Sequence, residues 1–267
     1  MCGGHNWETP PVLILLPPSE GKAVPRRGRP LDLGTGPLAD ARCALVDAVV
    51  DLCRGSEEAA IATLGLGPTQ ADDVRRNARL RDLPTAPAER VYTGVLYDAL
   101  GLTTLSASAH RRALSRVAIV SSLYGVVRPG ERIAPYRLGG GVTLPGLGGV
   151  AAHWRTHLDP VISGLAGRGL VVDLRSSTYA AFWRPTAALA ARVVTVRVLH
   201  EVDGRRQVVS HFNKATKGRL VRALLEDGRD PRTSAAFARL LADLGWQVEV
   251  ADASAQGTRL DVVVAAL

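Results

Sequence analysis

The residues of this chain that can do acid–base or nucleophilic chemistry are few, and lysine is the rarest of the basic ones. Only three of the 33 basic side chains are lysines, namely Lys22, Lys214 and Lys217, and the other 30 are arginines. Lysine carries a compact charge on an amine that titrates, whereas arginine is a planar fork that stays protonated. So strong a bias predicts that lysine remains where arginine cannot serve, and we expect at least two of the three in one functional pocket.

Two functions are compatible with these lysines. In an enzyme, Lys214 or Lys217 would act as base or nucleophile because neighbouring cations lower its pKa, with Glu20 as proton partner and Lys22 beside it in the same motif. In a binding protein, the same amines would attract a phosphate-rich ligand. The change Glu20→Gln distinguishes the two functions, because a binder tolerates it and an enzyme loses turnover while it keeps its affinity.

The charge balance favours an anionic partner. The chain has 25 acidic against 33 basic residues, a net charge of +8, and its isoelectric point is about 10.0. This balance is typical of proteins that bind nucleic acid or phosphorylated metabolites, although solubility alone also accounts for it. All five tyrosines lie between residues 92 and 179. Tyrosine faces beside arginines would allow nucleic-acid bases to stack, whereas any single tyrosine is more simply a core residue.

A glycine turn between two short helical patterns is the sharpest local motif. It reads Gly65-Leu-Gly67 and is followed by a helix with arginines. The pattern, over about residues 57–80, resembles a helix-hairpin-helix, in which backbone N–H groups at a helix N-terminus hold a DNA phosphate. An ordinary helical hairpin with a glycine turn is the alternative. The candidate phosphate contacts in this element are Gly65, Gly67, Thr69, Arg75 and Arg76.

Metal and cofactor chemistry has little support in the sequence. His153 and His157 are spaced to share a helix face, but no third ligand follows nearby. The three cysteines lack a CxxC spacing and are too few for a disulfide framework. Glycine motifs of dinucleotide and P-loop sites are missing, as is the GxSxG of hydrolases. We expect no metal and no cofactor.

The elements that must position these residues alternate between strands and helices. Strands are predicted at 12–16, 117–121, 170–174, 191–198, 205–212, 246–250 and 260–264. Helices are predicted at 38–53, on both sides of the glycine turn, and at 91–100, 107–114, 150–165, 216–225 and 234–244. Residues 130–149 are expected to form a long functional loop, and 203–204 a hairpin turn. The simplest fold is a single α/β domain over residues 12–267, with a mixed central sheet flanked by helices and residues 1–11 as a flexible leader.

Composition excludes several classes of protein. The chain has 267 residues, of which 46% are hydrophobic and 22% charged, which is too apolar for a disordered protein. Its longest apolar runs are far shorter than the roughly 20 residues of a bilayer-spanning helix. The start has no signal-peptide pattern. We therefore expect a cytoplasmic protein without a membrane partner.

Several motifs occur together in an order and spacing that resemble one family, the peroxide stress protein YaaA family. They are Pro17-Pro-Ser-Glu-Gly-Lys22, Val91-Tyr-Thr-Gly94, Leu123-Tyr-Gly125 with Arg128-Pro129, Pro135-Tyr-Arg137, Trp154, Val172-Asp-Leu-Arg-Ser176 with Tyr179, and Phe212-Asn-Lys-Ala-Thr-Lys-Gly-Arg219. The resemblance covers about residues 12–250. It implies an α/β fold particular to that family, a positively charged cleft, and a helix-hairpin-helix that binds DNA. The implied role is protection from peroxide, through less oxidative DNA damage and less free iron.

The motif residues supply the remaining candidates for DNA or phosphate binding. They are Ser19, Tyr92, Tyr124, Arg128, Tyr136, Arg137, Arg175, Ser176, Tyr179 and Arg219. The chain departs from the family pattern at Glu20, where better-known members carry lysine, and Lys22 is placed to supply the displaced charge. DNA is the expected partner. An enzyme acting on a phosphorylated or nucleotide-like small molecule in the same cleft is the alternative.

Overall fold

A mixed sheet of eight strands organises the molecule, in the part of the chain that the computed structural model describes, residues 12–202, 205–207 and 210–265. The strand order is β11-β12-β9-β8-β1-β3-β4, with β10 paired to β9. Strands β12, β9, β8, β1 and β3 run parallel, whereas β11, β10 and β4 join antiparallel. The predicted α/β class, with a mixed central sheet flanked by helices, is confirmed.

The strands and helices have the following bounds. The strands are β1 (Val12–Leu16), β2 (Ala86–Pro87), β3 (Val117–Ser121), β4 (Gly125–Val127), β5 (Arg132–Ile133), β6 (Thr143–Leu144), β7 (Gly148–Gly149), β8 (Leu170–Asp173), β9 (Val193–Val202), β10 (Arg205–Gln207), β11 (Gln247–Ser254) and β12 (Gly257–Ala265). The α-helices are α1 (Ala39–Arg54), α2 (Glu57–Leu64), α3 (Ala71–Asn77), α4 (Ala88–Val91), α5 (Val95–Leu100), α6 (Ala107–Arg116), α7 (Val150–Arg155), α8 (Leu158–Ala166), α9 (Ser177–Ala180), α10 (Ala187–Ala190), α11 (Ser210–Asp227) and α12 (Ser234–Asp243).

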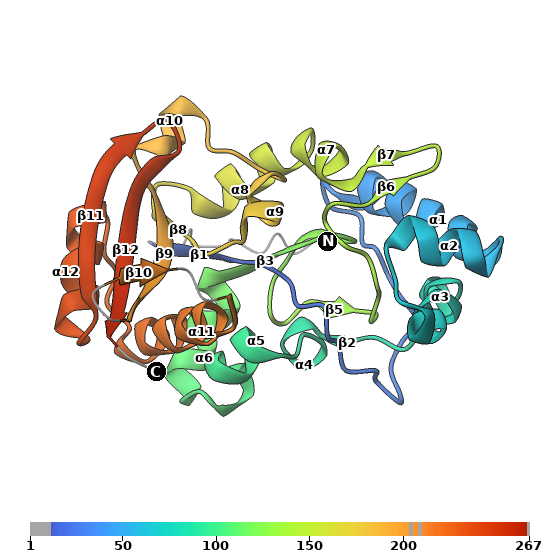
Figure 1. Cartoon of the computed structure of the whole chain (residues 1–267), viewed down its shortest axis with the longest axis horizontal. Coiled ribbons are helices and arrows are strands. Elements are labelled where there is room, and N and C mark those ends of the chain that lie inside the picture. The colour runs from blue at the N-terminus through green and yellow to red at the C-terminus, as the bar shows by residue number, and fades with distance from the viewer. Residues whose placement is uncertain (1–11, 203–204, 208–209, 266–267) are drawn as a thin grey trace, which may run out of the picture.

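The central strands are buried on both faces, which is why they read as continuous apolar runs rather than as alternating patterns. Every residue of β1, β3 and β8 is buried. Figure 1 shows α6 and α11 on one side of these strands and α8 on the other. Burial of these strands between helices removes apolar surface from water. Each Å² removed stabilises the folded state by roughly 25 cal/mol, which makes this the largest favourable contribution to folding.

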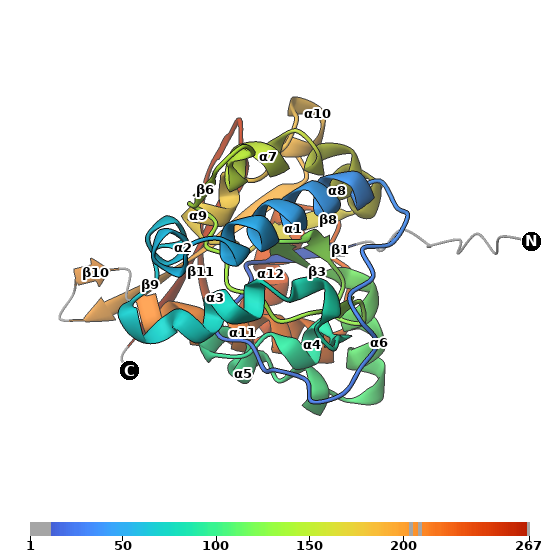
Figure 2. The same ribbon diagram turned by 90° about the vertical axis from the view of Figure 1, so that its right-hand side faces the viewer.

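Helices α1, α2 and α3 form a group of their own beyond the end of β1 (Figures 1 and 2). Helix α1 packs its apolar side, including Leu45, Val46 and Val49, into the core. Its Arg42 donates from Nε to the carbonyl of Tyr124 over 2.9 Å and from Nη2 to that of Val126 over 2.7 Å. The group is therefore attached to the segment that follows β3.

Several predicted elements differ from the structure. The helix expected at 91–100 begins only at Val95 in α5, after Gly94 with a φ of 95°, and the loop expected at 130–149 contains the short strands β5, β6 and β7. The strand expected at 205–212 ends at Gln207, because the chain is already helical from Ser210 in α11. The antiparallel pairing with β9 that favoured this strand is limited to Arg205–Gln207, and α11, which packs along α5, begins soon after it. The helix expected at 150–165 is divided into α7 and α8 near His157. The predicted leader 1–11 and the turn 203–204 lie outside the described residues. Within the described ranges, no helix has the length and apolar character to cross a membrane.

Candidate functional site

The carboxyl ends of three parallel strands meet at one edge of the sheet. Strand β1 lies between β3 on one side and β8 on the other. The chain thus leaves β1 toward β3 and later returns to the opposite side of β1 with β8. Such a reversal is the place where open α/β sheets bind ligands. We call this place the carboxyl edge; it comprises residues 17–22 after β1, 121–124 at the end of β3 and 174–179 after β8.

Lys22 is fixed at this edge by groups from its own loop and from the tyrosines. Its Nζ donates to the carbonyl of Ser19 over 2.7 Å and lies 4.0 Å from the ring centroid of Tyr136. Lys22 also forms a β-bridge with Tyr92. Burial lowers the pKa of Lys22 to about 7, and the positive charge of Arg137 adds to the lowering. An appreciable fraction of this amine is therefore neutral at physiological pH.

Lys217 reaches the same edge from α11. Its Nζ donates to the carbonyl of Leu174 over 2.9 Å and to that of Arg175 over 3.5 Å, directly after β8. Burial lowers the pKa of Lys217 to about 8, although the negative charge of Asp173 opposes the lowering. Lys214, on the same helix, has an exposed side chain. Two of the three lysines thus lie at the carboxyl edge, whereas Lys214 faces solvent.

Buried tyrosines form the wall behind Lys22. The hydroxyls of Tyr92 and Tyr136 are hydrogen-bonded at 3.2 Å, and that of Tyr136 is bonded to Ser121 Oγ at 2.8 Å. Burial raises the pKa of both tyrosines above the usual value. Tyr124 packs edge-on against Tyr136, with ring centroids 5.4 Å apart. All three are at most 2% exposed, so they support Lys22 rather than offering faces for base stacking.

Tyr179 is the one motif tyrosine that is only partly buried. Its hydroxyl is bonded to Ser122 Oγ at 3.0 Å, which joins the segment after β8 to the end of β3. Burial, together with the neighbouring Tyr136, raises its pKa. Tyr179 therefore closes the edge on the side of β8.

An ion pair stands at the solvent side of Lys22. Arg137 Nη2 lies 3.2 Å from Glu20 Oε2; the Glu20 side chain is 84% exposed and that of Arg137 is 23% exposed. The backbone of Arg137 is held by Asn77 of α3, whose Nδ2 donates to its carbonyl while Oδ1 accepts from its N–H. An incoming anion can therefore replace Glu20 on an arginine whose backbone is already fixed.

Ser19 and Thr93 hold the loop of Lys22. Ser19 Oγ donates to the carbonyl of Gly21 over 2.6 Å and accepts from the N–H of Thr93 over 3.2 Å. Thr93 and Asn77 were not among the sequence candidates. Thr93 stands inside the Val91–Gly94 motif, which is a usable signal, whereas nothing in the sequence around Asn77 sets it apart.

Two predicted arginines have structural partners instead. Arg175 forms a bidentate pair with Asp173, Nε to Oδ1 at 2.9 Å and Nη2 to Oδ2 at 2.7 Å, and also donates to the carbonyls of Tyr179 and Trp183. Arg128 donates to the carbonyl of Val117, the first residue of β3, which lies at the amino end of that strand, away from the carboxyl edge. The side chains of Ser176 and Arg219 are exposed.

The hairpin of residues 57–77 has the expected turn but a mixed charge. Gly65 ends α2 with φ of 62°, a left-handed conformation that favours glycine. The N–H of Gly67 donates to Gln70 Oε1 over 2.9 Å. Arg75 is paired with Glu57 and Asp72, at 2.9 and 2.6 Å, and Arg76 is paired with Asp73. Thr69 is exposed. Both predicted phosphate-binding arginines therefore already have carboxylate partners, and the helix-hairpin-helix assignment stays a prediction.

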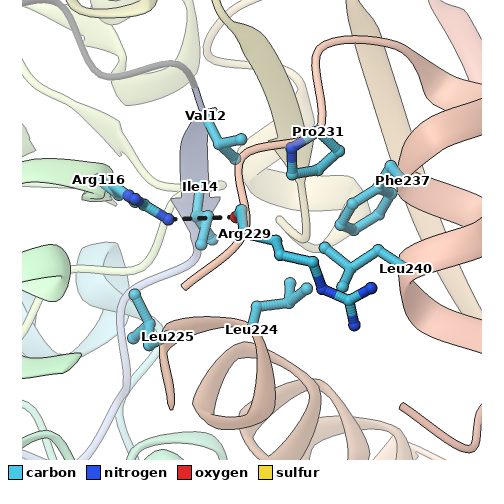
Figure 3. A pocket seen from close by; sticks show the side chains of 9 residues that line it. All are labelled: Val12, Ile14, Arg116, Leu224, Leu225, Arg229, Pro231, Phe237 and Leu240. Carbon is cyan, nitrogen blue, oxygen red and sulfur yellow. Dashed lines mark hydrogen bonds between the residues drawn. The ribbon is translucent and has the colours of Figure 1, made fainter. Parts of the chain in front are cut away.

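Two cavities lie away from Lys22. The first holds about 10 Å³, room for no more than a water molecule, at the amino end of β1. Figure 3 shows its wall, where Arg116 Nη1 donates to the carbonyl of Arg229 over 3.4 Å. The second holds about 280 Å³ beside α1, and Tyr124 is the one sequence candidate that lines it.

The predicted histidine pair is bonded to backbone. His153 Nε2 lies 3.0 Å from the carbonyl oxygen of Ala41, and His157 Nδ1 lies 2.8 Å from that of His153. Among the residues that the structure describes, no three His, Cys, Asp or Glu side chains are grouped so as to hold a metal ion.

These features define a mixed α/β protein with two lysines of lowered pKa at the switch point of its sheet. The model of the family described as peroxide stress protein YaaA matches residues 12–249. A UPF0246 protein of Streptomyces coelicolor is 50% identical over 95% of this chain and 98% of its own length. UPF0246 proteins of Corynebacterium efficiens and Corynebacterium glutamicum are 39% and 37% identical, over 90% and 89% of this chain and 95% of each relative. The chain belongs to the YaaA peroxide stress protein family.

Proposed function

We propose that the carboxyl edge is an active site for a phosphorylated or nucleotide-like small molecule, with Lys22 as its proton acceptor. The observation that carries this proposal is the buried amine of Lys22, with a pKa of about 7, at the switch point of the sheet. A lysine that is partly neutral near pH 7 serves as a general base or a nucleophile, and groups tuned in this way concentrate at functional sites.

The ion pair beside Lys22 supplies the means to bind an anion. Glu20 is mostly exposed, whereas Arg137 is largely covered and its backbone is fixed by Asn77. A phosphate oxygen can take the place of the Glu20 carboxylate on Arg137, with a charge-assisted hydrogen bond of similar length. In the enzyme, the released Glu20 then serves as the proton partner of Lys22. Lys217 holds the backbone after β8 in place through its two carbonyl bonds.

The test is a binding and turnover screen of the purified chain against nucleotides and phosphorylated metabolites. Lys22→Met should abolish turnover, and Lys214→Met is the matched control because it removes the same charge from an exposed position. Glu20→Gln should lower turnover while the affinity remains. If Lys22→Met and Lys214→Met behave alike, Lys22 is not the proton acceptor.

DNA binding is the second candidate, through the hairpin and the surface charge. The net charge of +8 and the left-handed Gly65 turn favour it, and Asn77 links α3 of the hairpin to Arg137 at the carboxyl edge. The ion pairs of Arg75 with Asp72 and of Arg76 with Asp73 weaken the case for DNA binding, because these arginines already have carboxylate partners. In this proposal the chain protects DNA from oxidative damage and limits free iron during peroxide stress, with no residue assigned to iron.

Gly67→Val tests the DNA proposal without disturbing the fold. A Cβ at Gly67 would meet only Gln70 Oε1, at an ordinary 3.7 Å. Binding to duplex, single-stranded and bubble DNA is measured over a salt series, and we expect steep salt dependence and about tenfold weaker binding of the variant. Lys214→Ala should weaken binding to every DNA form alike. Unchanged affinity of Gly67→Val would rule out the hairpin as the DNA contact.

A further inference from the structure

A second concave site lies on the other side of the tyrosine wall from Lys22. This cavity of about 280 Å³ is bounded by residues 29–34, by Arg42 of α1 and by residues 131–133 around β5. We call it the arginine pocket. Figure 2 shows the coil that precedes α1 running past α4 before it enters the first turn of α1. The volume is slightly below the roughly 300–1,000 Å³ of typical small-molecule sites, which favours a small ligand.

The coil that forms one wall is held in a single position. Both the N–H and the Oγ1 of Thr85 donate to the carbonyl of Arg29 over 2.9 Å. A Cβ at Gly28 would lie 2.3 Å from the carbonyl oxygen of Thr85, so only glycine permits this close approach. These contacts fix the wall of the pocket, so binding to it does not require the coil to become ordered.

Two arginines that line the pocket are held by hydrogen bonds from Nε and Nη2, and within the described ranges each keeps one nitrogen without a hydrogen bond. Arg42 uses Nε and Nη2 for the carbonyls after β3, and Arg132 uses Nε and Nη2 for Oγ1 and the carbonyl of Thr85. Among the described residues, Nη1 of each has no hydrogen-bond partner. Burial lowers the pKa of Arg42, although the carboxylate of Glu131 opposes this. A partly covered guanidinium with a free N–H is a suitable donor to an oxyanion.

The other charged residues of the pocket leave it with a small excess of positive charge. Arg29 is exposed at the rim, and the acidic lining residues are Asp32 and Glu131. Asp32 Oδ1 accepts from the N–H of Gly34, and Glu131 Oε1 accepts from the N–H of Arg128. Glu131 Oε2 also lies 3.7 Å from Arg42 Nη2. Three arginines therefore face two carboxylates, and an incoming phosphate competes with Glu131 for Arg42. Pro30, Leu33 and Ile133 add apolar walls.

We infer that the arginine pocket binds a small phosphate monoester, held by the partly covered Arg42 and by Arg132 and Arg29, which are exposed. The planar fork of arginine matches the geometry of phosphate oxygens, and the apolar walls accommodate the organic part of the ligand. This site is separate from the carboxyl edge, because Tyr124 and Tyr136 stand between the pocket and Lys22.

The experiment is a titration of the ¹⁵N-labelled full chain with inorganic phosphate, a nucleoside monophosphate and citrate. We expect saturable shifts of the amides of residues 31–34 and 131–133, strongest with the monophosphate. Arg29→Ala should weaken binding at least about fivefold, the loss of one charge-assisted contact. Arg26→Ala is the matched control, because Arg26 is an exposed arginine of the same coil that does not line the pocket.

The variant Lys22→Met tests whether binding in the arginine pocket is independent of the proposed active site. It should leave the shifts at residues 31–34 unchanged, whatever becomes of turnover. Equal losses in Arg29→Ala and Arg26→Ala would show that phosphate responds to general charge, and would overturn the assignment. Shifts confined to other parts of the chain would overturn it as well, as would tighter binding of citrate than of the phosphates.

Discussion

The hairpin and the carboxyl edge contain the same kinds of charged residues in opposite surroundings. In the hairpin, Arg75 and Asp72 form a pair whose side chains are 60% and 82% exposed. At the edge, Arg175 and Asp173 form a pair whose side chains are 2% and 9% exposed. An exposed pair gains little free energy, whereas a buried pair must stay complete because a lone buried charge is costly. The number of arginines in a motif therefore says little about what those arginines do.

The largest difference between the two regions should appear when each pair loses its carboxylate. Asp173→Ala leaves Arg175 buried without its counter-charge, and we expect the free energy of unfolding to fall by about 3–5 kcal/mol. Asp72→Ala should cost under about 1 kcal/mol, because water replaces the exposed carboxylate. Urea unfolding of both variants measures the two costs. Similar costs at the two positions would contradict the comparison.

The second-largest effect is a dependence of folding stability on pH, which arises because the amine of Lys22 is buried. Its pKa is about 7 in the folded chain against 10.5 for a free lysine, so above pH 7 the unfolded chain binds more protons than the folded one. Stability from this group therefore rises with pH between about 7 and 10.5, and is lowest below pH 7, where the amine is charged in both states. Between pH 7 and pH 9 the expected gain is about 2 kcal/mol.

Lys22→Met should flatten that rise, and unfolding curves at pH 7, 8 and 9 measure it. Lys217, with a pKa of about 8, contributes a smaller rise of the same sign, which remains in the Lys22 variant. Lys214→Met is the control, since it removes the same charge from an exposed side chain. A Lys22 variant with the full wild-type rise would mean that this amine is not desolvated in the folded chain.

The sequence predicted the strands, helices and motifs better than it predicted which charged side chains are buried, paired or exposed. The apolar runs of β1, β3 and β8 are unambiguous because these strands are buried on both faces. The scarcity of lysine singled out Lys22 and Lys217, which the fold brings to one edge although 195 positions separate them (217 − 22).

The rest depended on tertiary contacts that no local pattern encodes. Lys214 has the same composition argument as Lys217 and lies one turn earlier on the same helix, yet its side chain is exposed, whereas that of Lys217 reaches the carbonyl of Leu174. The motif arginines also looked alike in sequence. Arg128 holds a carbonyl at the amino end of β3, whereas Arg137 stands beside Lys22. Which carboxylate or carbonyl lies opposite an arginine is decided by strand order, and strand order follows from the packing of the whole chain.

A smaller effect separates the two glycines of the hairpin. Gly65 has φ of 62°, where an L-residue is strained, whereas Gly67 has φ of −76°, which any residue adopts. We expect Gly65→Ala to lower the free energy of unfolding by about 1 kcal/mol and Gly67→Ala to change it by under about 0.5 kcal/mol. Thermal melts of the two variants measure the difference. Equal melting temperatures would mean that the turn at Gly65 does not need a left-handed residue.

The smallest expected effect is also the one that decides how the hairpin uses its charge. Arg75→Ala breaks contacts with both Glu57 and Asp72 but leaves no buried group unpaired, since all three side chains are at least half exposed. The free energy of unfolding should fall only slightly, and 1 M salt should remove most of the difference from wild type. If Arg75 holds a DNA phosphate, the same variant should weaken DNA binding and reduce its salt dependence by about one counterion. Loss of stability without loss of DNA affinity would assign Arg75 to the hairpin alone, because its carboxylate partners then keep it from the phosphate.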